Sequence, residues 1–173
     1  MKYLVIKYGG SVLEHIPHTF YENIVELFNK GEVKPVIVHG GGPLISKLLT
    51  KLGIESRFVN GLRITTEPVL DVVEMVLSGA VNKEIVRKLR QANGDAFGIS
   101  GVDGMLLKAL PTVDAEILGF VGEVVEVNTE LIINILDQGY IPVISPLGID
   151  ENGQRYNING DIAASAIAKA LSG

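Results

Sequence analysis

The sequence has no cysteine among its 173 residues. Structural disulfides and thiolate metal sites are therefore excluded, and the absence fits a reducing compartment. No apolar run approaches the ~20 residues that a membrane-spanning helix needs. The apolar part of residues 1–7 is also too short for a signal peptide. We therefore expect a cytoplasmic protein without a membrane partner.

Positive charge is scarce as well. Lysine and arginine number 15 against 20 aspartates and glutamates, which gives a formal net charge of −5. The one dense basic stretch, residues 83–90, interleaves its charges with apolar residues at helical spacing, and this is typical of a solvated helix face. We expect no nucleic-acid partner, because proteins that bind nucleic acid usually carry a basic patch. An anionic small molecule would need a site that is locally positive.

The chain does contain a regular alternation of apolar runs and segments of helical spacing. Hydrophobic residues make up 47% of the sequence and charged residues 20%, which is typical of a soluble globular domain. The alternation predicts an α/β fold in which helices cover both faces of a parallel or mixed sheet. The expected strands are 3–8, 35–39, 96–100 and 141–145, and the expected helices are 19–30, 43–52, one from about 67 to 77, 81–92, 128–138 and 162–171.

Two stretches are less regular. Residues 58–66 have the pattern of two short strands around Asn60-Gly61, which is a strong signal for a hairpin turn. Residues 106–127 are β-like but irregular, and a turn is expected at 150–153. No linker or internal repeat interrupts the chain, so we treat residues 1–173 as a single domain.

The strongest chemical signal is the segment VIVHGGGP at residues 36–43. A buried strand leads into three glycines and then into a helix with proline in its first turn. Glycines let backbone N–H groups face a ligand, and the helix N-terminus adds partial positive charge, so Gly41 and Gly42 could cradle a phosphate or a carboxylate. The alternative is a tight turn without a ligand. Neither a dinucleotide-binding fingerprint nor a P-loop occurs, so ATP would be bound by a different motif.

A second glycine turn, Gly9-Gly10, follows the first strand and its lysine, Lys7. A lysine in an apolar strand must reach solvent or find an anion. Because ligands gather at the ends of strands in open α/β sheets, the position of Lys7 favours a phosphate contact. Arg63, just after the hairpin turn, could hold a carboxylate with two parallel hydrogen bonds. An arginine in a hairpin is, however, more often a surface residue.

Polar residues also precede the last helix. Asn157, Asn159 and Asp161 are residue types that commonly cap helices, but three polar groups in this position would also suit a ligand. The three histidines, His15, His18 and His39, lack the spacing of metal ligands, and we expect them to be structural or exposed. No protein metal site is predicted.

Five segments of the chain carry a family resemblance: VIKYGGS at 5–11, VIVHGGGP at 36–43, NGLRITTEPVLDVVEMVLSGAVNKEIV at 60–86, GYIPVISPLGI at 139–149 and NINGDIAASAIAKAL at 157–171. Taken together, they resemble the amino acid kinase family, and within it the N-acetylglutamate kinases. The long segment at 60–86 separates the chain from the family's aspartate, glutamate and uridylate kinases. The resemblance implies a three-layer α/β/α sandwich with an open, mainly parallel sheet, as in carbamate kinase.

The resemblance also implies a reaction. ATP, with Mg²⁺, would phosphorylate the side-chain carboxylate of N-acetyl-L-glutamate in arginine biosynthesis. A carboxylate with a reference pKa near ~4.3 is already ionised at pH 7, so no general base is needed. By likeness, Lys7 and Asp161 are catalytic. Lys7, Gly9 and Gly10 bind phosphate, whereas Gly41, Gly42, Arg63 and Asn157 bind the substrate.

Two departures from the family pattern are visible. Gly160 stands where the family usually has alanine, which is a small change. Family members also continue into a C-terminal lobe that binds the nucleotide and is absent from this chain. Residues 1–173 are therefore expected to be the N-terminal amino-acid-substrate lobe, and on its own this lobe is expected to be inactive. The last helix would then expose an apolar face that includes Ile162, Ala166 and Ile167.

Two other functions stay open. One is a kinase for a related acidic substrate, such as a carrier-linked aminoadipate, and the other is a non-catalytic module that binds an acylated amino acid. Family members that arginine inhibits resemble one another in an extra N-terminal helix, whereas the first strand here begins by Tyr3. We therefore expect a homodimer without that switch, with the helix after Glu67 forming part of the contact.

Overall fold

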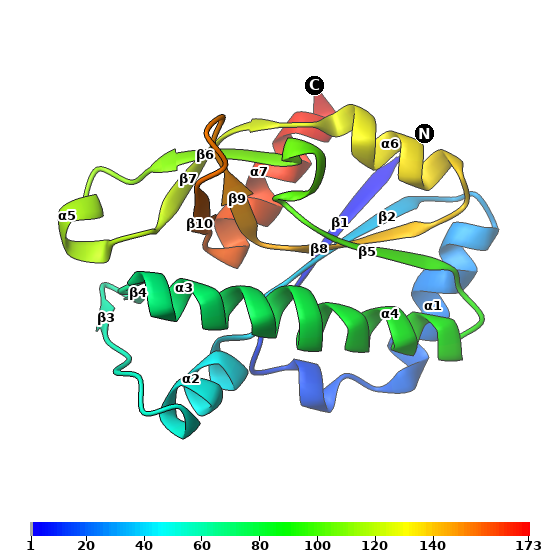
Figure 1. Cartoon of the computed structure of the whole chain (residues 1–173). Coiled ribbons are helices and arrows are strands. Elements are labelled where there is room, and N and C mark those ends of the chain that lie inside the picture. The colour runs from blue at the N-terminus through cyan, green and yellow to red at the C-terminus, as the bar shows by residue number, and fades with distance from the viewer. Residues whose placement is uncertain (1) are drawn as a thin grey trace.

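The computed structural model describes residues 2–173, and a four-stranded parallel sheet lies at its centre (Figure 1). All three strand pairings are parallel, and the sheet order is β1–β2–β8–β5. The inner strands are apolar and buried because helices cover both faces. All four strands lie where the sequence predicts them: β1 (Tyr3–Tyr8), β2 (Lys34–His39), β8 (Ile141–Ser145) and β5 (Ala96–Ser100).

Helices form the two outer layers, which confirms the three-layer α/β/α sandwich. Two hydrophobic clusters, one on each face of the sheet, fill the space between the layers. On one face lie α1 (His18–Asn29), α2 (Gly42–Lys51) and a long helix described below, and on the other lie α6 (Thr129–Asp137) and α7 (Gly160–Ser172). Short helical turns occur at η1 (Leu13–His15), η3 (Asp103–Met105) and α5 (Ala115–Leu118).

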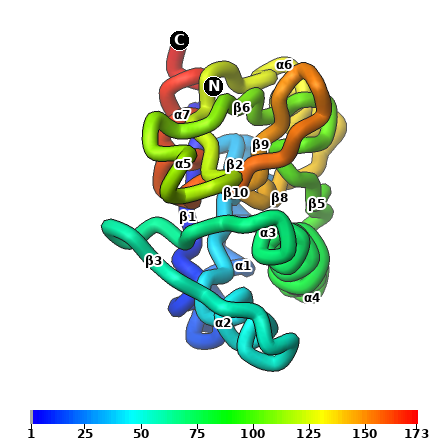
Figure 2. The backbone as a smooth tube through the Cα atoms, turned by 60° about the vertical axis from the view of Figure 1, so that its left-hand side comes forward, coloured from blue at the N-terminus to red at the C-terminus, as the bar shows by residue number. Residues whose placement is uncertain are grey.

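The long helix corrects one prediction. The sequence predicts two helices with a break after residue 77, but the chain stays helical throughout, and Figure 2 shows it as one continuous coil. Its middle part is a π-helix of seven residues. The three consecutive parts are α3 (Glu67–Glu74), η2 (Met75–Val81) and α4 (Asn82–Gln91).

The apolar pattern explains the π-helical part. Buried residues recur every fourth position from Val73 through Leu77, Val81 and Ile85 to Leu89. In a regular α-helix of 3.6 residues per turn, each such step rotates the apolar face by about 40°. Wider π turns reduce that drift. The apolar residues therefore keep facing the sheet along the whole helix.

A second sheet covers the end of the molecule beyond the carboxyl ends of the central strands. Its order is β10–β9–β6–β7, and it contains both parallel and antiparallel pairs. The irregular stretch 106–127 becomes two of its strands, with α5 between them. The strands are β6 (Leu107–Pro111), β7 (Gly122–Val127), β9 (Leu147–Ile149) and β10 (Arg155–Asn157).

The hairpin at 58–66 forms as predicted. Strands β3 (Phe58–Val59) and β4 (Leu62–Arg63) pair in antiparallel fashion. Asn60 and Gly61 both have positive φ, 50° and 78°, as a tight hairpin turn between two strands requires.

The apolar face expected on the last helix is present only in part, since Ala166 is half-buried. Ile162 is 46% exposed, but Ile167 is fully buried. Helix α7 packs across the sheet through Ala163, Ala164 and Ile167, and these three residues belong to the core of this domain. None of the helices within residues 2–173 has both the length and the hydropathy of a membrane span.

Candidate functional site

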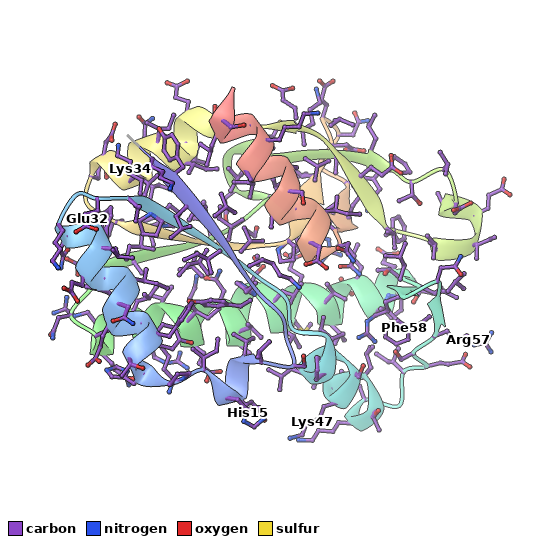
Figure 3. All side chains as sticks on the ribbon, turned by 180° about the vertical axis from the view of Figure 1, so that it is seen from behind. His15, Glu32, Lys34, Lys47, Arg57 and Phe58 are labelled. Carbon is purple, nitrogen blue, oxygen red and sulfur yellow. The ribbon has the colours of Figure 1, made fainter. Side chains whose placement is uncertain are left out.

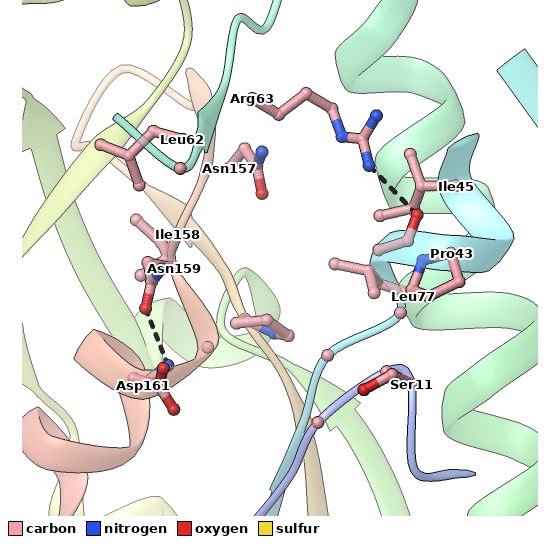
Figure 4. Close-up of a pocket in the computed structure, with 18 of the residues that line it drawn as sticks. Ser11, Pro43, Ile45, Leu62, Arg63, Leu77, Asn157, Ile158, Asn159 and Asp161 are labelled. Carbon is pink, nitrogen blue, oxygen red and sulfur yellow. Dashed lines mark hydrogen bonds between the residues drawn. The ribbon is translucent and has the colours of Figure 1, made fainter. Parts of the chain in front are cut away.

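A cavity of about 360 Å³ opens at the carboxyl ends of β1 and β2 (Figure 4). The two glycine turns form its floor, and the β3–β4 hairpin and the β10–α7 junction form its walls. In open α/β sheets ligands bind outside the carboxyl ends of the strands. The eight residues predicted from the sequence all line this cavity: Lys7, Gly9, Gly10, Gly41, Gly42, Arg63, Asn157 and Asp161.

The two glycine turns touch each other through their backbones. A Cβ atom on Gly10 would lie 2.8 Å from the Cα and N atoms of Gly41 and from the N atom of Gly42. Only glycine permits this approach, because a backbone cannot move aside as a flexible side chain can. The Gly40 N–H also donates to the Tyr8 carbonyl, over 2.9 Å, which extends the β1–β2 pairing into the turns.

The glycine turns offer unpaired hydrogen-bond donors to the cavity. The N–H groups of Gly9, Gly10, Gly41 and Gly42 have no acceptor among residues 2–173. Helix α2 begins at Gly42, so its N-terminal dipole adds partial positive charge at the same place. Such a set of backbone donors suits phosphate or carboxylate oxygens.

Lys7 and Asp161 form an ion pair at the other side of the floor. Their Nζ and Oδ1 atoms are 3.0 Å apart, and the Lys7 side chain is 29% exposed. Asp161 lies in the first turn of α7, whose N-cap is Asn159; the Asn159 side chain accepts from the Asp161 and Ile162 N–H groups. Asp161 thus fixes the position of the lysine ammonium beside Gly9 and Gly160.

Arg63 is buried at the wall of the cavity, with only 7% of its surface exposed. Nη1 donates to Ser56 Oγ over 2.6 Å, and Nη2 donates to the Gly42 carbonyl and to Ser46 Oγ, each over 3.1 Å. The guanidinium also lies 4.5 Å from the centre of the Phe58 ring. Figure 4 shows Arg63 and Asp161 on opposite sides of the same space.

The charge of Arg63 is not neutralised within the described chain. Other arginines pair with carboxylates, but no ion pair joins Arg63 to an Asp or Glu of residues 2–173. Burial lowers the pKa of Arg63, but an arginine stays protonated in proteins. The result is a buried cation with three of its five N–H groups bonded to neutral partners and two unpaired within the described chain.

Asn157 connects two walls of the cavity. Its Nδ2 atom donates to Thr65 Oγ1 over 3.2 Å, and the Thr65 hydroxyl donates to the Arg63 carbonyl over 2.8 Å. Strand β10 and the hairpin are thereby held at a fixed separation. Asn157 and Thr65 are 92 positions apart in the sequence, so only the fold brings them into contact.

A sequence profile of the amino acid kinase family matches residues 2–173. The chain belongs to the amino acid kinase family. The acetylglutamate kinase of Shouchella clausii is 54% identical over 170 residues, which cover 98% of this chain and 65% of that protein. The chain therefore spans just under two thirds of that relative's length.

Solved structures agree with the family assignment. The crystal structure of smu.665 from Streptococcus mutans superposes with a TM-score of 0.92 at 32% identity, over 98% of this chain and 69% of that one. Carbamate kinase of Giardia shares the fold, with a TM-score of 0.65 at 15% identity over 98% of this chain and 69% of that chain. These likenesses confirm the carbamate kinase-like fold that the resemblance implies.

The histidines of this family member lie outside the cavity. His39 is fully buried below the glycine turn, whereas His15 and His18 are exposed, and Figure 3 shows His15 at the surface. Within residues 2–173 no three His, Asp or Glu side chains are placed so that they could hold a metal ion.

Sequence reasoning missed the residues that hold Arg63 and the apolar lining of the cavity. Ser46 and Ser56 come from α2 and a loop, and no local pattern marks them. Phe58 could have been noticed, because it stands opposite Arg63 in a two-stranded hairpin. The apolar lining comes from separate elements: Ile45, Phe58, Leu62, Leu77, Val121, Pro146 and Ile158.

Proposed function

We propose that this chain provides the amino-acid-substrate site of an acetylglutamate kinase. Such an enzyme transfers the γ-phosphoryl group of ATP to the side-chain carboxylate of N-acetyl-L-glutamate, in arginine biosynthesis. The observation that carries the proposal is the buried, unneutralised guanidinium of Arg63 at the wall of the cavity. A substrate carboxylate would supply the missing negative charge. The relatives named acetylglutamate kinase support the choice of substrate.

The proposed substrate has two carboxylates, and the cavity has two cationic regions. Arg63 and Asn157 would hold the α-carboxylate, and the apolar lining around Phe58 and Leu62 would surround the methylene and acetyl groups. The side-chain carboxylate would then lie toward Lys7 and the glycine turns. Phosphoryl transfer gathers negative charge there, and preorganised N–H donors and an ammonium stabilise it.

ATP and Mg²⁺ complete the proposed reaction. We propose that Mg²⁺ arrives bound to the ATP phosphates, as it commonly does in kinases. We also propose that residues 1–173 form the substrate lobe and that a second lobe holds most of the nucleotide. The length of the Shouchella clausii acetylglutamate kinase, of which this chain covers 65%, supports that division.

A binding measurement on the purified chain tests the substrate. Isothermal titration should detect N-acetyl-L-glutamate, and the signal should weaken strongly for N-acetyl-L-glutamine, which lacks the side-chain carboxylate, and for L-glutamate, which lacks the acetyl group. Tighter binding of an acylated aminoadipate would favour the alternative substrate class. Equal binding of N-acetyl-L-glutamine, or no binding of any acylated acidic amino acid, would refute the proposal.

We further propose a cytoplasmic homodimer. The helix after Glu67, expected to form part of the contact, buries Val69, Val72 and Val73 inside the domain, so only its outer side, with Met75 61% exposed, could contribute. The free edge of β5 supports a different contact, because Phe97 on this strand and the neighbouring Tyr140 are 48% and 38% exposed.

A further inference from the structure

The π-helical part of the long helix lies against the glycine turn of the cavity. A Cβ atom on Gly41 would lie 2.7 Å from Leu77 Cδ2 and 3.2 Å from Val81 Cγ2, and both residues belong to the π segment. π turns are rare and occur often at functional sites. The residue that follows the segment, Asn82, is fully buried. A buried amide is costly unless its polar atoms are paired, so its partners matter.

Asn82 contacts three parallel strands with one amide nitrogen. Its Nδ2 atom lies 3.0 Å from the Val143 carbonyl of β8, 3.2 Å from His39 Nε2 of β2 and 3.4 Å from the Ile99 carbonyl of β5. Its Oδ1 atom accepts from Lys83 Nζ over 2.8 Å. The amide is therefore held on both sides, and its orientation is fixed.

The sheet is shaped to admit this side chain. A Cβ atom on Gly98 of β5 would lie 2.1 Å from Asn82 Oδ1 and 2.7 Å from Lys83 Nζ. Any other residue at position 98 would push Asn82 out of its place. The glycine in the strand thus marks a close approach of the helix.

His39 carries the contact from Asn82 to the glycine turn. Its Nδ1 atom is 3.0 Å from the Gly40 carbonyl, so Nδ1 carries the proton and donates. Nε2 is then free to accept from Asn82. Burial lowers the pKa of His39 to about 4, so the ring is neutral at pH 7 and keeps this one tautomer. The Gly40 carbonyl begins the turn whose next N–H groups face the cavity.

We propose that Asn82 and His39 are positioning residues for the cavity. They hold the Gly40–Gly42 turn so that its N–H groups face the bound anion and the Gly42 carbonyl meets Arg63. The proposal rests on the proposed function for the identity of the ligand, but the structural link can be tested without any ligand.

The test compares Asn82→Ala with Ser78→Ala in the purified chain. Ser78 lies in the π segment that precedes Asn82, and its variant loses a hydrogen bond of its own, to Ser145 over 3.0 Å, but it does not touch the glycine turn. NMR should show displaced amide resonances for Gly40, Gly41 and Gly42, and a changed His39 ring-nitrogen pattern, in Asn82→Ala alone. Wild-type resonances for the turn in Asn82→Ala would overturn the proposal.

Ligand affinity gives a second measurement. Loss of one buried hydrogen bond in the support of the turn should weaken N-acetyl-L-glutamate binding about tenfold in Asn82→Ala. Ser78→Ala should bind as the wild type does. Displaced glycine amides with unchanged affinity would also overturn the positioning role. A wild-type chain that binds no acylated amino acid would refute the proposed function only, because the amide resonances still decide the link.

An isosteric variant covers the case in which Asn82→Ala does not fold. Asn82→Asp keeps the shape of the side chain but removes the donor and places a carboxylate beside His39 Nε2. A neighbouring carboxylate favours the imidazolium form, so both ring nitrogens should be protonated near pH 6. A ring that keeps the single wild-type tautomer at that pH would show that position 82 does not act on His39.

Discussion

Arg63 shows how one residue can limit what a cavity accepts. Burying an ion costs several kcal/mol, and only good geometry and further hydrogen bonds offset that cost. Arg63 has three donated hydrogen bonds and an aromatic ring beside it, but all of these partners are neutral. The site is thus prepared for an anion before the anion arrives, which is how preorganisation raises affinity.

Arg63→Lys should therefore not be a conservative change. An ammonium cannot reproduce the planar fork that reaches Ser56, Ser46 and the Gly42 carbonyl together. In the complete, active kinase we expect affinity for N-acetyl-L-glutamate to fall by about 100-fold, in the range for truncating a buried charged contact, with little change in the KM for ATP. Arg57→Lys is the matched control, since Arg57 is exposed in the adjoining segment (Figure 3). Equal affinities for the two variants would remove Arg63 from the site.

Lys7 should act on the rate more than on binding. Negative charge increases beside its ammonium as the phosphoryl group moves, so Lys7→Ala should lower kcat of the active kinase by ~10²-fold or more. Asp161→Asn should also lower kcat, because the ion pair at 3.0 Å holds the ammonium in place. Steady-state kinetics with both substrates provide the measurement. Normal turnover in either variant would contradict the assigned roles.

His39 should make the stability of the protein depend on pH. Its pKa is about 4 in the folded chain and 6.5 in the unfolded chain, so the unfolded state binds more protons between these values. The contribution of His39 to the free energy of unfolding is complete above pH 6.5. It is lost as the pH falls toward 4, at up to about 1.4 kcal/mol per pH unit. Urea unfolding at several pH values should show this slope in the wild type and in His15→Gln, but not in His39→Gln. Parallel slopes in all three proteins would show that His39 is not the group responsible.

At the scale of elements, the contact between the two glycine turns determines the floor of the cavity. Gly10→Ala must separate the turns, because its Cβ atom would meet backbone atoms at 2.8 Å. Overpacking of this kind typically costs about 1–3 kcal/mol. Gly42→Ala is the control for stability, since no atom lies within 4 Å of the added Cβ. Thermal unfolding should show a lowered midpoint in Gly10→Ala alone, and equal midpoints would mean that the turns can move apart freely.

Most elements could be predicted from the sequence because each has a local cause. The hairpin follows from Asn60-Gly61, whose backbone tolerates positive φ. Helix α6 has Asn128 as its N-cap, and the Asn128 side chain accepts from the Leu131 N–H. The long helix could not be predicted as one element. Its continuity depends on packing against the sheet, and the local pattern near Gly79 resembles a break.

The cavity also combines features that have a local cause in the sequence with features that depend on the fold. Its charged and glycine residues were predictable, because strand ends and helix N-termini bring such residues together in open α/β sheets. The residues that hold these cavity residues in place could not be predicted. Ser46, Ser56 and Asn82 act through partners that are distant in the sequence, and nothing in their own neighbourhoods identifies those partners. Apolar lining residues such as Leu77 also resemble ordinary core residues until the fold places them.

At the scale of the whole molecule, the free edge of the central sheet is where we expect a second copy to bind. Strand β5 ends the sheet order, so no strand of the described chain pairs with its outer edge. Phe97 and Tyr140 project there, with ring centres 5.9 Å apart. A groove of about 660 Å³ beside them is lined by Leu131 and Ile135 of α6. Unpaired strand edges readily pair with another chain, and a two-fold axis would place the same residues on both sides.

Phe97→Asp should therefore convert the proposed dimer into a monomer. The substitution places two like charges across the two-fold axis and removes an aromatic side chain that is 48% exposed in the single chain. Val113→Asp is the matched control, because Val113 is 92% exposed in the loop before α5, away from this edge. Light scattering after size-exclusion chromatography should give a dimer mass for the wild type and Val113→Asp, and a monomer mass for Phe97→Asp. A monomeric wild type would contradict the dimer, and a dimeric Phe97→Asp would place the contact on another face.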